Sequence, residues 1–167
     1  MARSTSHVTA LQFAPGHLAF TRARATDQGF ETEGSVIEYG DWDPSSGALA
    51  SALADFVKRH GLADDALYYV LPRHEAAARI LELPSQDAEE MRGMVHLSAE
   101  EIVPYPLNEL LTSYTVLESL SGGSSRVLAV VVKKSVVESA LDIISSAGLH
   151  VEQVLLSTAS ILTAVQS

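Results

Sequence analysis

The chain has 167 residues, 47% of them apolar, and its 21 acidic and 11 basic residues give a formal net charge of −10. This length suits one domain or two small subdomains that share a core, and the apolar content excludes general disorder. The acidic excess argues against nucleic-acid binding, which needs a basic face for the phosphates. Because the chain has no cysteine, disulfides, thiol catalysis and cysteine-bound zinc are excluded, which fits a reducing compartment.

The N-terminal half reads as a series of strands interrupted by one helix. Pro15-Gly16 and the stretch before Gly29 are turn signals, because proline restricts φ and glycine permits positive φ. Asp43 and Pro44 are typical of an N-cap and first helical residue, and Gly61 is placed where that helix should end. Strands are expected at residues 7–13, 18–25, 30–39, 66–71 and 76–83.

The C-terminal half predicts two helices, three strands and a final short helix. Asp87 and Glu90 have capping-box spacing, which predicts the start of a helix. Pro104 and Pro106 should end this helix. Ser135 is expected to cap a second helix that turns its apolar side inward. That apolar side consists of Val136, Val137, Ala140, Leu141 and Ile144. The remaining elements are strands at 110–120, 126–133 and 149–156, and a helix over 158–167.

This order of elements predicts a mixed α/β or α+β architecture, with a small α-β-β-α unit inserted near residues 89–147. The longest apolar run, residues 127–132, is too short to cross a membrane and suits a buried strand. The N-terminus has no apolar segment of the kind found in signal peptides. A soluble, cytoplasmic protein is therefore expected.

No group of residues predicts catalysis. The six histidines are scattered without metal-ligand spacing, so surface positions are favoured over a metal site. The acidic pairs Asp64-Asp65, Glu89-Glu90 and Glu100-Glu101, and the basic pair Lys133-Lys134, are expected to be solvated. Tyr105 stands apart, because two flanking prolines make its turn rigid. It either packs within the turn or lines a groove for a partner peptide.

Residues 66–165 resemble the PilM family, actin-like cytoplasmic proteins of type IV pilus assembly. The resemblance is carried by Leu83-Pro84, by Val103-Pro104-Tyr105-Pro106 and by Tyr114-Thr115-Val116-Leu117. Residues 127–147 and the Ala147-Gly148-Leu149 passage also fit. The cytoplasmic domain of GspL, from type II secretion, is similar as well, and the sequence does not separate the two families.

The resemblance implies an actin-like, ribonuclease H-like subdomain over residues 1–83 and 148–167, with a small inserted subdomain over 84–147. It also implies a phosphate-binding hairpin, but Gln12 stands where that hairpin has its aspartate. A neutral amide does not replace a carboxylate in holding hydrated Mg²⁺. No cofactor or metal is therefore expected here. ATP would need the second half of a longer native protein, and a longer gene is left open.

The function implied by the resemblance is that of a non-catalytic scaffold, peripheral to the inner membrane through its partners. It would dock the cytoplasmic tail of a PilN-like membrane protein in a groove between the two subdomains, with contacts to other components of the pilus or secretion platform. Two alternatives are an actin-like ATPase and a cell-division scaffold like FtsA, and homo-oligomerisation is left open. The residues expected to line the groove, with core packing as the alternative, are Met91, Met94, Val95, Val103 and Tyr105.

Overall fold

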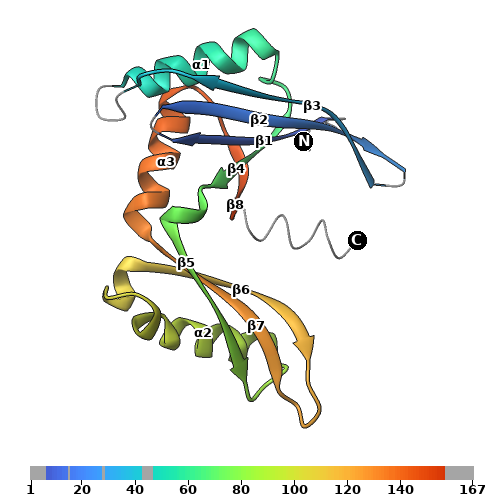
Figure 1. Cartoon of the computed structure of the whole chain (residues 1–167), viewed down its shortest axis with the longest axis vertical. Helices are drawn as coiled ribbons and strands as arrows, with labels where there is room; N and C mark the ends of the chain where they lie inside the picture. Colours follow the sequence, from blue (N-terminus) through green and yellow to red (C-terminus); the bar gives the residue numbers. More distant parts are fainter. Residues whose placement is uncertain (1–6, 15, 28, 43–46, 157–167) are drawn as a thin grey trace. The chain divides into compact units, whose positions relative to one another are not determined.

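A computed structural model describes residues 7–14, 16–27, 29–42 and 47–156. The described residues form two compact units (Figure 1). One unit comprises those within 1–72 and 140–167, and the other comprises residues 73–139. The mixed α/β architecture predicted from the sequence is confirmed.

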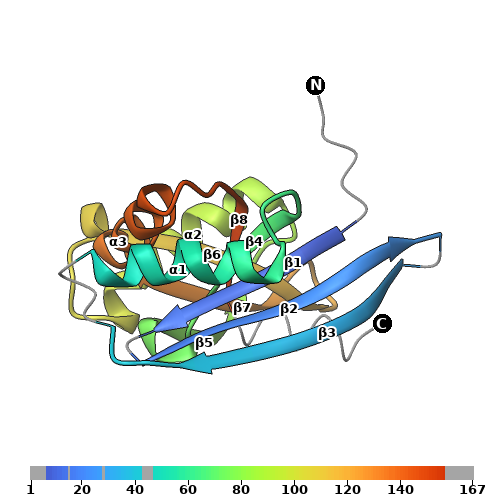
Figure 2. The same ribbon diagram turned by 90° about the horizontal axis from the view of Figure 1, so that it is seen from above.

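The first unit contains a five-stranded sheet with the strand order β3-β2-β1-β4-β8. The strands β1, β2 and β3 form an antiparallel meander, which Figure 2 shows side by side with β3 outermost. Strand β4 is parallel to β1, and β8 is parallel to β4. The strands span His7–Ala14 (β1), His17–Thr26 (β2), Gly29–Tyr39 (β3), Ala66–Leu71 (β4) and Val151–Leu156 (β8).

Helix α1 (Ala48–His60) contributes its apolar side to the core of this unit. Phe56 is fully buried, and its ring meets that of Phe20 from β2 edge-on with 5.6 Å between centroids. The helix ends as predicted at Gly61, whose φ of 65° lies in the left-handed region. There the N–H of Gly61 donates to the Lys58 carbonyl and that of Leu62 to the Val57 carbonyl, the two bonds of a Schellman motif.

A buried ion cluster lies just after α1. The side chain of Asp65 is only 3% exposed. It accepts hydrogen bonds from Thr9 Oγ1 at 2.6 Å and Arg22 Nη2 at 2.8 Å. The expectation that Asp65 is solvated was therefore wrong, because folding brings a β1 hydroxyl and a β2 guanidinium to this loop and satisfies the carboxylate away from water.

The second unit contains a three-stranded antiparallel sheet with the order β5-β7-β6 and one helix beside it, α2 (Ala88–Ile102). The strands span Ala76–Leu83 (β5), Leu110–Ser119 (β6) and Ser125–Lys133 (β7). The sequence predicts residues 76–83 as part of the other subdomain. In the structure, β5 pairs with β7 from Ala76↔Val132 to Leu83↔Ser125. A pairing partner so distant in sequence is not visible in local patterns.

Helix α2 begins with the cap that the sequence predicts, in modified form. The Asp87 carboxylate accepts from the backbone N–H groups of Glu89 and Glu90. The Glu90 side chain does not return to the backbone of Asp87 as in a capping box. Instead, Ser85 Oγ donates to Glu90 Oε2 at 2.6 Å and accepts from the Asp87 N–H at 3.0 Å. Ser85 therefore bridges the Glu90 side chain and the Asp87 backbone N–H, which contact each other directly in a capping box.

Helix α3 (Lys134–Ser146) begins one residue before its expected cap, Ser135, and the division between the units falls within it. Val137, Ala140 and Ile144 are buried as predicted, but Leu141 is 37% exposed, so its inward assignment was wrong. Leu141 follows Ala140 by one residue, which turns it about 100° around the helix axis. The expected Asp43-Pro44 cap and the expected helix over 158–167 lie outside the described residues.

Candidate functional site

The candidate site is built around the turn that ends α2. Val103 has an extended backbone, because the following Pro104 disfavours helical geometry. The N–H of Tyr105 then donates to the Val103 carbonyl at 2.9 Å, which closes a tight turn across Pro104. Pro106 leads into the short 3-10 helix η3 (Leu107–Glu109). The two prolines therefore present Tyr105 on a rigid segment, where it stays 40% exposed.

Lys133, the last residue of β7, holds the Tyr105 ring in place. Its ammonium lies 4.2 Å from the ring centroid, within the range of a cation–π interaction. The same nitrogen is 4.0 Å from Glu109 Oε2. The ring and the ammonium over its face together form one wall.

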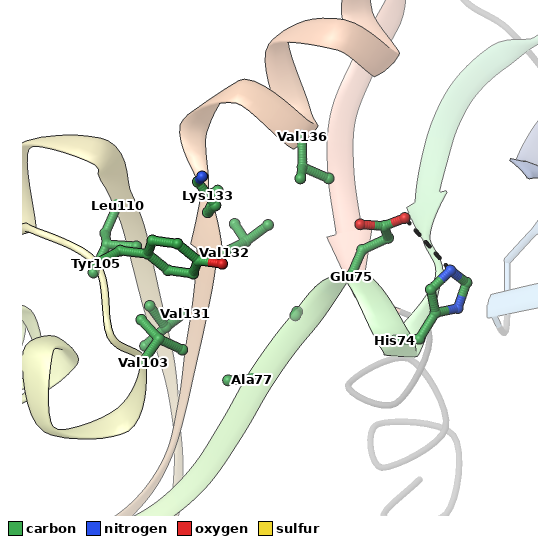
Figure 3. A pocket seen from close by; sticks show the side chains of 11 residues that line it. His74, Glu75, Ala77, Val103, Tyr105, Leu110, Val131, Val132, Lys133 and Val136 are labelled. Atoms are coloured by element: carbon green, nitrogen blue, oxygen red, sulfur yellow. Dashed lines mark ion pairs between the residues drawn. The ribbon is translucent and has the colours of Figure 1, made fainter. Parts of the chain in front are cut away.

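A cavity of about 440 Å³ opens beside this wall, entirely within the second unit (Figure 3). Most of its lining is aliphatic, and Leu110 and Val131 are nearly fully buried. The volume of the cavity lies within the ~300–1,000 Å³ typical of ligand sites, and its lining suits a small ligand or an apolar side chain. The lining residues are His74, Glu75, Ala76, Ala77, Val103, Tyr105, Leu110, Val131, Val132, Lys133 and Val136.

The opposite rim of the cavity carries the carboxylate of Glu75 beside the imidazole of His74. It is formed by the short 3-10 helix η2 (Arg73–Glu75), which precedes β5. Arg73 Nη1 donates to the Ala76 carbonyl at 2.8 Å and so fastens this turn to the strand. His74 Nε2 lies 3.4 Å from Glu75 Oε1, an ion pair only when the imidazole is protonated. Figure 3 shows Glu75 and Tyr105 on opposite sides of the hollow.

The five residues expected to bind a partner divide into two groups. Met91 and Val95 are 4% and 1% exposed in a core cluster with Leu83, so they have the packing role that the sequence left as the alternative. Met94 is partly buried against the same cluster. Val103 and Tyr105, in contrast, line the cavity.

Two important residues of the cavity, Glu75 and Lys133, were not identified from the sequence. The sequence predicts Lys133 and Lys134 as a solvated pair, whereas in the structure Lys134 donates to the Asn108 carbonyl at 2.6 Å. Glu75, Tyr105 and Lys133 are separated by 28 residues or more and meet only through the pairing of β5 and β6 with β7. The flanking prolines of Tyr105 were the one local signal.

The β1–β2 hairpin of the first unit does not fit a magnesium-bound phosphate. Gln12 faces its neighbour strand, and its Nε2 lies 3.5 Å from His17 Nε2. The described residues 11–14 and 16–18 contain no carboxylate that could hold hydrated Mg²⁺. Over the described part of the chain, no group of three histidine, aspartate or glutamate side chains is placed to hold a metal ion.

A second hollow, of about 690 Å³, lies in the first unit beside Trp42. Charged side chains dominate it. Glu38 accepts from His60 at 3.0 Å and from Arg59 at 2.7 Å. The hydrogen bond from His60 is the main cause that lowers the pKa of the Glu38 carboxyl. Desolvation by burial raises this pKa, and the hydrogen bond and charge of Arg59 lower it further. These groups satisfy one another, so this hollow is the weaker candidate for a peptide.

No family model and no curated protein matches the sequence. Among solved structures, the chain is similar to a PilM-PilN type IV pilus biogenesis complex, with a TM-score of 0.78 and 16% identity over 94% of this chain and 48% of that one. It is also similar to the cytoplasmic domain of EpsL, an inner membrane component of the type II secretion system of Vibrio cholerae. That match has a TM-score of 0.61 and 15% identity over 90% of this chain and 57% of the other.

A Bacteroides thetaiotaomicron protein with an actin-like ATPase fold and unknown function matches with a TM-score of 0.53 and 10% identity, over 98% of this chain and 56% of that one. These similarities confirm the expected actin-like fold of PilM-like and GspL-like proteins. The chain spans about half the length of the structures that it matches. No described helix is both long and apolar enough to cross a bilayer.

Proposed function

We propose that the chain is a non-catalytic docking scaffold of a type IV pilus or type II secretion assembly. In this role it lies at the cytoplasmic side of the inner membrane and binds the cytoplasmic tail of a PilN-like membrane protein. The similarity to a PilM-PilN complex supports this choice of partner. The observation that carries the proposal is the cavity beside Tyr105, an apolar hollow in an otherwise strongly acidic chain.

The cavity has the features of a peptide anchor site. Its floor is made of aliphatic side chains from β5, β6, β7, α3 and the turn after α2, which favours an apolar side chain of the ligand. Tyr105 adds a large ring that is already oriented by two prolines and Lys133, so little entropy is lost when it contacts a ligand. Such preformed aromatic anchors tend to dominate binding energies.

The proposal of a non-catalytic role is supported by the β1–β2 hairpin. Its Gln12 supplies an amide where an actin-like ATPase needs a carboxylate, so we infer that this chain binds no Mg-ATP by itself. Calorimetry with Mg-ATP should detect no heat of binding. Tight binding would favour the alternative, a nucleotide-dependent actin-like protein, over a scaffold.

A titration with a fluorescent peptide tests the docking proposal directly. The probe is the cytoplasmic tail of a PilN-like, single-span membrane protein, the partner that the proposal names. Replacing Tyr105 with alanine should weaken binding by about tenfold or more, the loss expected when a central aromatic anchor is truncated. Leu97→Ala is the matched control, because Leu97 is 69% exposed on α2 and does not line the cavity. Unchanged affinity for Tyr105→Ala would contradict the proposal.

A further inference from the structure

Glu75 carries a charge that the described residues do not compensate permanently. Its recorded partner is His74, which neutralises it only when protonated. No described lysine or arginine forms an ion pair with it, and the adjacent Arg73 is engaged with the Ala76 carbonyl. Three other glutamates, Glu31, Glu38 and Glu118, each meet an arginine at 2.7–2.8 Å. Other glutamates, such as Glu82, also have no recorded ion pair among the described residues, but Glu75 is the glutamate that lines the cavity.

The two rims of the cavity differ in how far their charges are satisfied. On one side, the Lys133 ammonium is engaged by the Tyr105 ring and by Glu109. On the other side, the carboxylate of Glu75 is 39% exposed and open to a ligand. The aliphatic floor lies between them (Figure 3). A ligand that fills the floor thus finds at its edge the carboxylate of Glu75, which has no permanently charged partner among the described residues.

We propose that the cavity recognises a tail segment in which a lysine or arginine flanks the apolar anchor and pairs with Glu75. This inference rests on the proposed function, because it takes a membrane protein's tail as the ligand. Cytoplasmic segments next to a membrane span carry an excess of lysine and arginine. A basic segment is also steered toward a chain with a net charge of −10, whereas an acidic one is repelled. Glu75 thereby determines specificity, and the apolar floor provides affinity.

The test measures two peptides against four proteins. The first peptide is the tail described above, and in the second every lysine and arginine is replaced by glutamine. The proteins are wild type, Glu75→Gln, Tyr105→Ala and Glu82→Gln. Glu82 is an exposed glutamate of β5 outside the cavity, so its variant controls for a general change in charge.

Glu75→Gln should weaken binding of the native tail by about two- to fivefold, the range of a partly exposed ion pair. The same variant should bind the glutamine-substituted tail as wild type does. Added salt should reduce the difference between the two peptides, because it screens exposed charges. Glu82→Gln should change the affinity for either peptide by less than Glu75→Gln changes the affinity for the native tail.

Three results would overturn the inference. One is equal affinity of wild type and Glu75→Gln for the native tail. The second is an equal loss with both peptides, which would show a structural role for Glu75. In both cases, continued sensitivity of binding to Tyr105→Ala would leave the proposed function standing. The third is the failure of either peptide to bind wild type, which would remove the proposed function and this inference together.

Discussion

Replacement of Asp65 should destabilise the first unit, because this carboxylate is the common acceptor of a buried cluster. Thr9 is fully buried and Asp65 nearly so, whereas the Arg22 side chain keeps 28% of its surface exposed. Removing one partner of a buried pair typically costs ~3–5 kcal/mol. Because Arg22 is partly exposed, its guanidinium can be solvated again or can pair with Glu33, whose carboxylate is 3.9 Å from Arg22 Nε. The loss is therefore expected at the lower end of this energy range.

We therefore expect Asp65→Ala to lower the free energy of unfolding by about 3 kcal/mol. Asp65→Asn keeps one acceptor for Thr9 but loses the charge that binds Arg22, so about 2 kcal/mol is expected. Asp64→Asn is the control, since Asp64 is exposed and should stay within about 0.5 kcal/mol of wild type.

Urea denaturation followed by tryptophan fluorescence measures this effect. Trp42 is the single tryptophan and belongs to the first unit, so its signal reports on the unit that contains Asp65. The reasoning is refuted if both Asp65 variants unfold within about 0.5 kcal/mol of wild type. It is also refuted if Asp64→Asn costs as much as Asp65→Asn.

Three further variants test local features of the fold. The hydrogen bond from His60 keeps the pKa of Glu38 below its ordinary 4.5. The ionised Glu38 therefore stabilises the fold above pH 4.5, and this stabilisation is lost as the pH falls through the folded-state pKa. The stability difference between wild type and Glu38→Gln should thus shrink on acidification, and a difference constant with pH would contradict this. Gly61→Ala should cost about 1–2 kcal/mol in urea denaturation, because residue 61 has a left-handed φ; no loss would argue against the Schellman cap. Gly93→Ala should instead stabilise by about 1 kcal/mol, because in mid-helix its added Cβ would meet no atom within 4 Å apart from the local helix backbone; a loss would indicate an unrecognised contact there.

Much of the secondary structure could be predicted from local patterns. The meander of β1, β2 and β3, strand β4 and the end of α1 at Gly61 all follow from alternation and turn chemistry, which act over a few residues. The cap of α2 at Asp87 was predicted for the same reason. The position of Leu141 was predicted wrongly because it lies at one edge of the apolar stripe of its helix. The sequence does not show which edge of such a stripe faces the core.

The candidate site was predicted only in part. Tyr105 was identified because two prolines mark its turn, whereas nothing local distinguishes Lys133 from a solvated strand-end lysine. Met91 and Val95 carry the same apolar signal as a binding surface but are covered by β5 and β7. An apolar stripe alone does not tell whether a protein's own sheet or a partner will cover it.

The sequence by itself determined the order of the main helices and strands that the structure describes, the end of α1, the start of α2 and the acidic character of the chain. These depend on backbone restrictions, side-chain periodicity and charge, all of which are local properties. The tertiary structure decided which residues meet across long separations. It buried Asp65 against Thr9 and Arg22, assigned β5 to the second sheet, and brought Glu75, Tyr105 and Lys133 around one cavity. Strand pairing and desolvation act between distant residues, so these outcomes depend on the whole fold.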